Sequence, residues 1–227
     1  ESSLQALKDI AQLYRANLDI KVVGITGSVG KTSTKETIAA VLSQKYKVLK
    51  TQGNFNNEIG LPLTIFRLTE EDEIAVLEMG ISDFGEMTRL TKIAQPDICV
   101  ITNIGLCHLE NLKSRDGILK AKTEIFKSMN PDGTVILNGD DDKLITISEV
   151  YGKKPVFFGI KNTAGIYADH IDRSSDLSAF IWQQIMLFRR RIRLKMRQKI
   201  LLCRFRLRES IWCIMPWQQR QSVRHSD

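Results

Sequence analysis

A glycine-rich segment near the N-terminus carries the residues best suited to chemistry. Residues 21–33 read KVVGITGSVGKTS, an apolar run followed by closely spaced glycines and then Lys31 and Thr32. Glycines let backbone N–H groups face a polyanion at a helix N-terminus, the lysine neutralises phosphate, and the hydroxyl can bind magnesium. Five residues separate Gly24 from Gly30, one more than in the common pattern. The segment predicts a nucleotide phosphate site, with a chance glycine turn before a helix as the alternative.

Alternating apolar runs and helix-like stretches must position this loop. Residues 1–18 have a helical period and predict an amphipathic lead-in helix. We expect strands at 21–26, 47–50, 74–78, 98–102, 134–138 and 156–158, and helices at 31–44, 61–67, 84–93, 116–128 and 142–151. This alternation predicts an α/β fold, with a mostly parallel sheet, helices on both faces and ligands beyond the carboxyl ends of the strands.

The loop TGSVGKTS resembles the phosphate loop of the Mur ligase superfamily. Five further segments match its later motifs in order: TQGNFNNEIGLPLT (51–64), LEMG (77–80), TNIGLCHLE (102–110), AKTEIF (121–126) and LNGDD (137–141). The resemblance covers about residues 4–170 and implies a P-loop, ATP-binding central domain at 19–179. The first of these segments is similar to the branch that uses D-alanyl-D-alanine. It argues against the folylpolyglutamate and cyanophycin branches, which remain the alternative ligases.

The resemblance assigns ATP and magnesium to particular residues. Glu78 would bind Mg²⁺, since a hard cation prefers carboxylate oxygen, together with Thr32. His108 and Lys122, the latter carbamylated, would hold a second Mg²⁺. Lys31, His108 and Lys122 are the implied catalytic residues. The implied contacts to ATP are Gly27, Ser28, Gly30, Lys31, Thr32, Ser33 and Asn138.

Each of these residue types also has a structural alternative on chemistry alone. A glutamate such as Glu78 at a strand end can cap a helix or carry a surface charge. His108 can be a satisfied structural histidine, because imidazole is a poor magnesium ligand. Lys122 can be a solvated lysine on a helix, and Asn138 can form an Asx turn before a helix.

The resemblance also implies two substrates, UDP-N-acetylmuramoyl-tripeptide and D-alanyl-D-alanine. Asn56 and Asn57 would contact the UDP-linked substrate, with a turn as the alternative. ATP would phosphorylate the tripeptide carboxylate, and the amine of D-alanyl-D-alanine would attack the acyl phosphate. Lys31, the loop N–H groups and two magnesium ions would stabilise the negative charge on the phosphoryl oxygens.

Charge is distributed unevenly along the chain. Of the 33 Lys and Arg residues 12 lie within 180–227, against 2 of the 26 Asp and Glu residues, so this stretch carries +10 and residues 1–179 carry −3. We expect 180–227 to be an aberrant basic tail, not a folded domain, produced by a frameshift near Ala179. One choice of codons, read one base out of register, restores a family-like PxPxxGxHMxYNAxAA pattern. A membrane-surface helix or a nucleic-acid-binding tail is the alternative.

The remaining expectations concern missing family domains, membrane spans, cellular location and partners. The family has an N-terminal domain for the UDP moiety and a C-terminal domain that closes over ATP, and neither is recognisable here, so we expect little turnover from this chain. No apolar run reaches the roughly 20 residues of a membrane span. The four cysteines have no CxxC spacing, which favours reduced thiols and a cytoplasmic location. We expect a monomer without a nucleic-acid partner; a non-catalytic nucleotide-binding module that uses its tail is the alternative.

Overall fold

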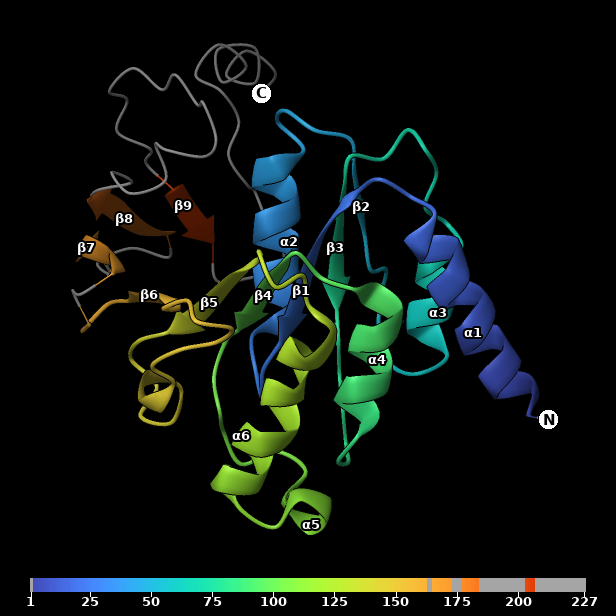
Figure 1. The fold of residues 1–227 in the computed structure, drawn as a ribbon. Helices are drawn as coiled ribbons and strands as arrows, with labels where there is room; N and C mark the ends of the chain where they lie inside the picture. The colour runs from blue at the N-terminus through green and yellow to red at the C-terminus, as the bar shows by residue number, and fades with distance from the viewer. Residues whose placement is uncertain (1, 163–164, 173–176, 184–202, 207–227) are drawn as a thin grey trace. The chain divides into compact units, whose positions relative to one another are not determined.

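The computed structural model describes residues 2–162, 165–172, 177–183 and 203–206 (Figure 1). The chain divides into two compact units, residues 1–165 and 166–227. The first unit contains every residue that the sequence motifs single out.

A parallel sheet forms the centre of the first unit. Its strands are β1 (Lys21–Thr26), β2 (Val48–Lys50), β3 (Ile74–Glu78), β4 (Ile98–Ile101), β5 (Thr134–Asn138) and β6 (Val156–Gly159), in the order β2-β3-β1-β4-β5-β6. Each of these neighbours pairs in parallel, with Val23 opposite Val76 on one side of β1 and opposite Ile98 on the other. The predicted parallel α/β sheet is confirmed, and every strand boundary lies within one residue of the expected one.

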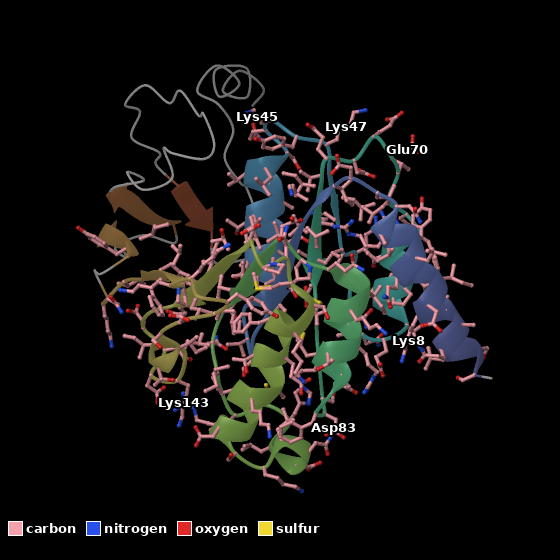
Figure 2. All side chains as sticks on the ribbon, in the orientation of Figure 1. Lys8, Lys45, Lys47, Glu70, Asp83 and Lys143 are labelled. Carbon is pink, nitrogen blue, oxygen red and sulfur yellow. The ribbon has the colours of Figure 1, made fainter. Side chains whose placement is uncertain are left out.

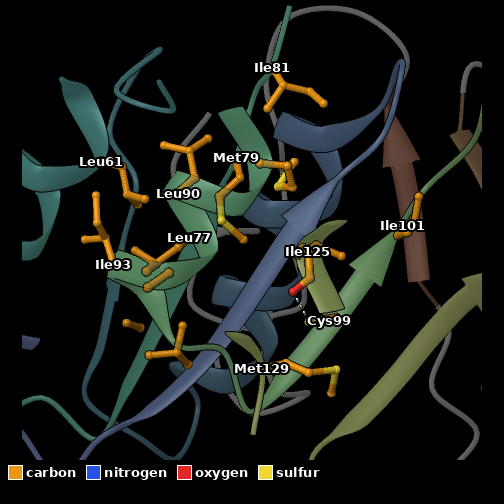
Figure 3. Close-up of a cluster of buried hydrophobic side chains, with 14 of the residues drawn as sticks. Leu61, Leu77, Met79, Ile81, Leu90, Ile93, Cys99, Ile101, Ile125 and Met129 are labelled. Atoms are coloured by element: carbon orange, nitrogen blue, oxygen red, sulfur yellow. Dashed lines mark hydrogen bonds between the residues drawn. The ribbon is translucent and has the colours of Figure 1, made fainter. Parts of the chain in front are cut away.

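Apolar side chains fill both faces of this sheet, as expected for parallel strands covered by helices. The helices are α1 (Ser3–Ala16), α2 (Lys31–Leu42), α3 (Gly60–Ile65), α4 (Glu86–Ala94) and α6 (Arg115–Thr123). Along β3, Ala75 and Leu77 face the core that contains residues of α1, α3, α4 and α6, part of which Figure 3 shows. Val76 faces the smaller core under α2. The predicted helices on both faces are therefore confirmed.

The lead-in helix is present as α1, and a buried arginine joins its C-terminal end to α4 and to the loop before β1. The Arg15 guanidinium donates to the backbone carbonyl oxygens of Ala94 (3.2 Å), Leu18 (2.9 Å) and Ile20 (3.2 Å). Burial lowers the pKa of Arg15, an effect that nearby carboxylates partly oppose. Near the middle of α1, Lys8, which is labelled in Figure 2, donates to Glu58 at 2.7 Å.

One predicted helix is wrong, and one is divided. Residues 142–151 contain only a single 3-10 turn, η2 (Leu144–Thr146), since the Asp141 carboxylate caps the amides of Lys143 and Leu144 but the β-branched run that follows disfavours a helix. The stretch predicted as one helix at 116–128 is α6 followed by the 3-10 helix η1 (Glu124–Ser128). A further short helix, α5 (Leu109–Leu112), was not predicted.

The second unit contains three antiparallel strands among its described residues. β7 (Ile166–Asp172) pairs with β8 (Leu177–Gln183), which pairs with β9 (Cys203–Arg206). Most of the expected aberrant tail, 180–227, lies outside the described residues, so its nature stays a prediction. No helix in the described ranges is long and apolar enough to cross a membrane.

Candidate nucleotide-binding site

The phosphate loop joins the carboxyl end of β1 to the first turn of α2. Gly27 and Gly30 have positive φ angles, 147° and 80°, which L side chains rarely adopt. A Cβ atom on Gly27 would lie 1.9 Å from the Thr102 hydroxyl oxygen, whereas one on Gly30 would meet nothing within 4 Å. Gly27 therefore allows both the turn and the close approach of the segment after β4.

Asn103, in that segment after β4, holds the loop in shape. Its side-chain oxygen accepts hydrogen bonds from the backbone N–H groups of Ser28 (3.1 Å) and Val29 (3.0 Å). The neighbouring Thr102 hydroxyl donates to the Val29 carbonyl at 2.6 Å, and the Ser28 hydroxyl accepts from the Gly105 amide at 2.8 Å. Sequence reasoning did not single out Asn103, although it belongs to a matched motif.

The Lys31 side chain lies back over its own loop. Its ammonium donates to the carbonyl oxygens of Gly27 (3.0 Å) and Ser28 (3.4 Å). Thr32 and Ser33 follow in the first turn of α2 and are exposed. A cation and the free N–H groups of a helix N-terminus thus lie together, an arrangement suited to phosphate.

Glu78, at the end of β3, lies directly beside this turn. Its side chain is 2% exposed, which excludes the surface-charge alternative. The oxygen Oε1 accepts from the Thr32 hydroxyl (3.3 Å) and the Asn56 amide (2.9 Å), and the Glu78 backbone N–H donates to the Thr51 hydroxyl (3.0 Å). The structure therefore brings three predicted site residues, Thr32, Asn56 and Glu78, into direct contact.

The other oxygen of Glu78, Oε2, faces a buried lysine. Within the described residues Oε2 has no hydrogen bond, and the Lys35 ammonium lies 3.6 Å away. Lys35 also lies 3.3 Å from the Glu36 carboxylate, which pairs with Lys50 of β2. Burial alone would raise the pKa of Glu36, but hydrogen bonds from Lys50 and Lys35 bring it below its ordinary value. Sequence reasoning missed Lys35, since a lysine on an amphipathic helix ordinarily faces solvent.

Lys122 is buried in α6, which excludes the solvated-lysine alternative. It is 1% exposed, which places it among the most buried side chains in the described part of the chain. Burial lowers its pKa from 10.5 to about 8; Cys107 opposes the shift and Lys31 adds to it. Lys122 thus lies within electrostatic reach of the loop lysine.

His108 precedes α5 and is exposed. Its backbone adopts a left-handed conformation, with a φ of 57°. Among the described residues its ring has no hydrogen-bond partner. In the described part of the chain, no hydrogen bond or ion pair joins His108 to Glu78 or Thr32.

Asn138 and Asn57 each stabilise a turn. The Asn138 amide donates to the Thr102 carbonyl (3.0 Å), and its oxygen accepts from the Asp140 amide (2.9 Å), the geometry of the Asx-turn alternative. Asn57 accepts from the amides of Ile59 and Gly60 at the start of α3. Neither side chain contacts the group around Glu78, so their ligand roles stay predictions.

The contacts around Glu78 fit a magnesium ion that is bound together with a nucleotide. No group of three or more His, Cys, Asp and Glu side chains in the described ranges is placed to hold a metal by itself. Mg²⁺ instead takes one or two protein oxygens plus phosphate oxygens and water. The Thr32 hydroxyl and the Oε1 oxygen of the buried Glu78 carboxylate, which are in contact, supply such a pair.

The fold and this loop geometry agree with a comparison with known families. A profile of the Mur ligase middle domain matches residues 25–200 of the chain. The chain belongs to the Mur ligase family. The match includes the phosphate loop, Glu78, Asn103 and Lys122, and it extends past Ala179, where the charge distribution changes.

Similar proteins in the Mur ligase family include both curated enzymes and solved structures. The UDP-N-acetylmuramoyl-tripeptide--D-alanyl-D-alanine ligase of Bacillus subtilis is 51% identical over 144 residues, 63% of this chain and 32% of its own length. Crystal structure I of MurF from Acinetobacter baumannii has a TM-score of 0.77 at 32% identity, covering 90% of this chain and 43% of that one. MurF from Thermotoga maritima in complex with ADP has a TM-score of 0.76 at 32% identity, covering 90% and 44%. The chain thus spans about a third of the length of the curated relatives it matches.

Proposed function

We propose that this chain is the ATP-binding part of a ligase that joins D-alanyl-D-alanine to UDP-N-acetylmuramoyl-tripeptide. The observation that carries the proposal is the contact between Thr32, directly after the loop lysine, and the buried Glu78 carboxylate. That contact lies at the carboxyl ends of neighbouring parallel strands, where ligands of such sheets bind. The named activity of the 51% identical Bacillus relative and the ADP of the Thermotoga complex support it.

Thr32 and Glu78 would hold Mg²⁺, which would neutralise charge on the phosphate oxygens. Lys31 would exchange its loop carbonyls for the terminal phosphates, since a charged partner forms the stronger hydrogen bond. The free N–H groups of the first turn of α2 would bind the remaining phosphate oxygens. Together these groups would stabilise transfer of the terminal phosphoryl group to the tripeptide carboxylate, after which the amine of D-alanyl-D-alanine displaces phosphate.

Lys122 would act as a carbamate. With a pKa of about 8, a sizeable fraction of its amine is neutral near physiological pH and can attack carbon dioxide, forming an N–C bond and releasing a proton. The product is a carboxylate-like group that would help His108 to hold a second Mg²⁺. We further infer that the enzyme works as a monomer in the cytoplasm, where ATP is available, and that Asn56, Asn57 and Asn138 contact its ligands.

Nucleotide binding tests this proposal. ADP binding to the 227-residue chain is measured by calorimetry, with saturating Mg²⁺ and with EDTA, for the wild type, Lys31→Met and Thr32→Val. Losing a charged contact to phosphate weakens affinity about ten- to a hundredfold, so Lys31→Met is expected to bind weakly in both buffers. Thr32→Val is expected to lose only the gain that Mg²⁺ provides.

The matched control is Lys45→Met, which removes an exposed cation beyond the far end of α2 (Figure 2). It is expected to bind as the wild type does. Absence of ADP binding by the wild type, or equal losses in all three variants, would contradict the nucleotide site. Phosphate release that depends on UDP-N-acetylmuramoyl-tripeptide, measured in a chain that also carries the remaining ligase domains, tests the substrate.

A further inference from the structure

Lys35 is a buried cation one helical turn after the phosphate-loop lysine. It is 1% exposed, among the most buried side chains in the described part of the molecule. A buried charge is costly unless it is paired, so a lysine at this depth needs nearby carboxylates. Lys35 lies on the same helix, α2, whose first turn carries Thr32 at the phosphate site.

Two carboxylates compensate this cation. The Lys35 ammonium lies 3.3 Å from Glu36 Oε1 and 3.6 Å from Glu78 Oε2. The second oxygen of Glu36 pairs with Lys50. Two lysines and two glutamates from α2, β2 and β3 therefore form a cluster without net charge, and its member Glu78 also contacts Thr32 beside the phosphate loop.

The two oxygens of Glu78 have different surroundings. Oε1 accepts hydrogen bonds from Asn56 (2.9 Å) and Thr32 (3.3 Å) and so lies on the side of the phosphate loop. Oε2 is buried without a hydrogen bond among the described residues, and the Lys35 ammonium is the cation that faces it. The attraction of Lys35 for Oε2 therefore favours the rotation of the carboxylate that directs Oε1 toward Thr32.

We propose that Lys35 is a positioning residue that holds Glu78 in the orientation required for binding of a magnesium nucleotide. The inference rests on the proposed function of the site. If Lys35 acted only by repulsion, the opposite effect on the Mg²⁺ response would be expected, because a cation near Glu78 opposes the approach of a divalent ion. Removing Lys35 should weaken the response to Mg²⁺ if positioning dominates and strengthen it if repulsion dominates.

The test measures ADP affinity of the full chain with saturating Mg²⁺ and with EDTA, for wild type, Lys35→Met and Lys35→Arg. Loss of a residue that orients a metal ligand typically costs about 10- to 100-fold in metal affinity. Lys35→Met is expected to lose about that much of the Mg²⁺-dependent gain and to keep its affinity in EDTA. Lys35→Arg, which retains the charge, is expected to recover most of the gain. Lys45→Met is again the control for loss of one positive charge.

A double-mutant cycle with Glu78→Gln separates positioning from a general structural effect. If Lys35 acts through Glu78, Lys35→Met should have no further effect on the Mg²⁺-dependent gain in the Glu78→Gln background. An unchanged or larger gain in Lys35→Met, or equal effects in both backgrounds, would overturn the inference. If Lys35→Met does not fold, Lys35→Gln replaces it under the same criteria. Failure of the wild type to bind ADP at all would instead refute the proposed function.

Discussion

At the scale of single residues, the buried amine of Lys122 makes stability depend on pH. Its pKa is about 8 in the folded protein and 10.5 ordinarily, so between these values the unfolded chain binds more protons. The free energy of unfolding should therefore rise by up to about 3 kcal/mol as the pH rises from 8 to 10.5. Below pH 8 both states carry the charge, and the cost of burying it is fully present.

This pH dependence of the free energy of unfolding is measured by urea unfolding of the wild type and Lys122→Met. The measurements run between pH 7 and pH 10.5, in buffers free of carbon dioxide. The variant should be more stable relative to the wild type at pH 7 than at pH 10.5. Lys120→Met, on the exposed side of the same helix, should follow the wild-type pH profile. Parallel profiles for Lys122→Met and the wild type would show that Lys122 is not buried as a charge.

The chemical roles of the phosphate-loop residues could be predicted from the sequence, but the side chains that they contact could not. The types and spacing of Lys31 and Thr32 predict phosphate and magnesium chemistry directly. The contact of Ser28 with Asn103 joins residues 75 positions apart, and that of Asn56 with Glu78 joins residues 22 apart. Such pairs depend on strand order, which local patterns do not encode.

At the scale of elements, the turn from β1 to α2 depends on the size of Gly27 as well as on its backbone angle. Gly27→Ala and Gly30→Ala both force a side chain into positive φ, which costs about 1–3 kcal/mol. Only Gly27→Ala adds a Cβ atom 1.9 Å from the Thr102 hydroxyl. We expect it to lower the free energy of unfolding by at least about 2 kcal/mol more than Gly30→Ala does.

Chemical denaturation of both variants measures that difference, and Thr102→Ala tests its cause. Combined with Gly27→Ala, the Thr102 substitution should recover part of the lost stability, giving a favourable coupling energy in a double-mutant cycle. Equal destabilisation by the two glycine variants would mean that the segment after β4 moves away at little cost.

Elements were predictable where both faces of a strand are buried. The central parts of β1 (residues 22–25) and β3 (residues 74–77) contain no polar side chain because helices cover both sides of the sheet. The wrongly predicted helix at 142–151 shows the limit of such patterns. There the Asp141 cap begins a turn, but the β-branched residues Ile145 and Ile147 do not continue it as a helix.

At the scale of the whole molecule, the sequence divides its charge between −3 in residues 1–179 and +10 in residues 180–227. All residues proposed to bind the nucleotide lie in the first part. A variant that ends at residue 179 should therefore bind magnesium ADP with unchanged affinity. It should elute from immobilised heparin at much lower salt, since clustered cations produce salt-dependent binding to polyanions.

Replacing Arg189, Arg190 and Arg191 by glutamine in the full chain provides the matched control. It should shift heparin elution in the same direction by a smaller amount while leaving the chain length unchanged. A large loss of ADP affinity on truncation alone would show that the basic segment supports the nucleotide-binding fold, contrary to an aberrant tail. Retained affinity in both variants would assign nucleotide binding to the parallel sheet and its phosphate loop, and the net positive charge to a separate part of the sequence.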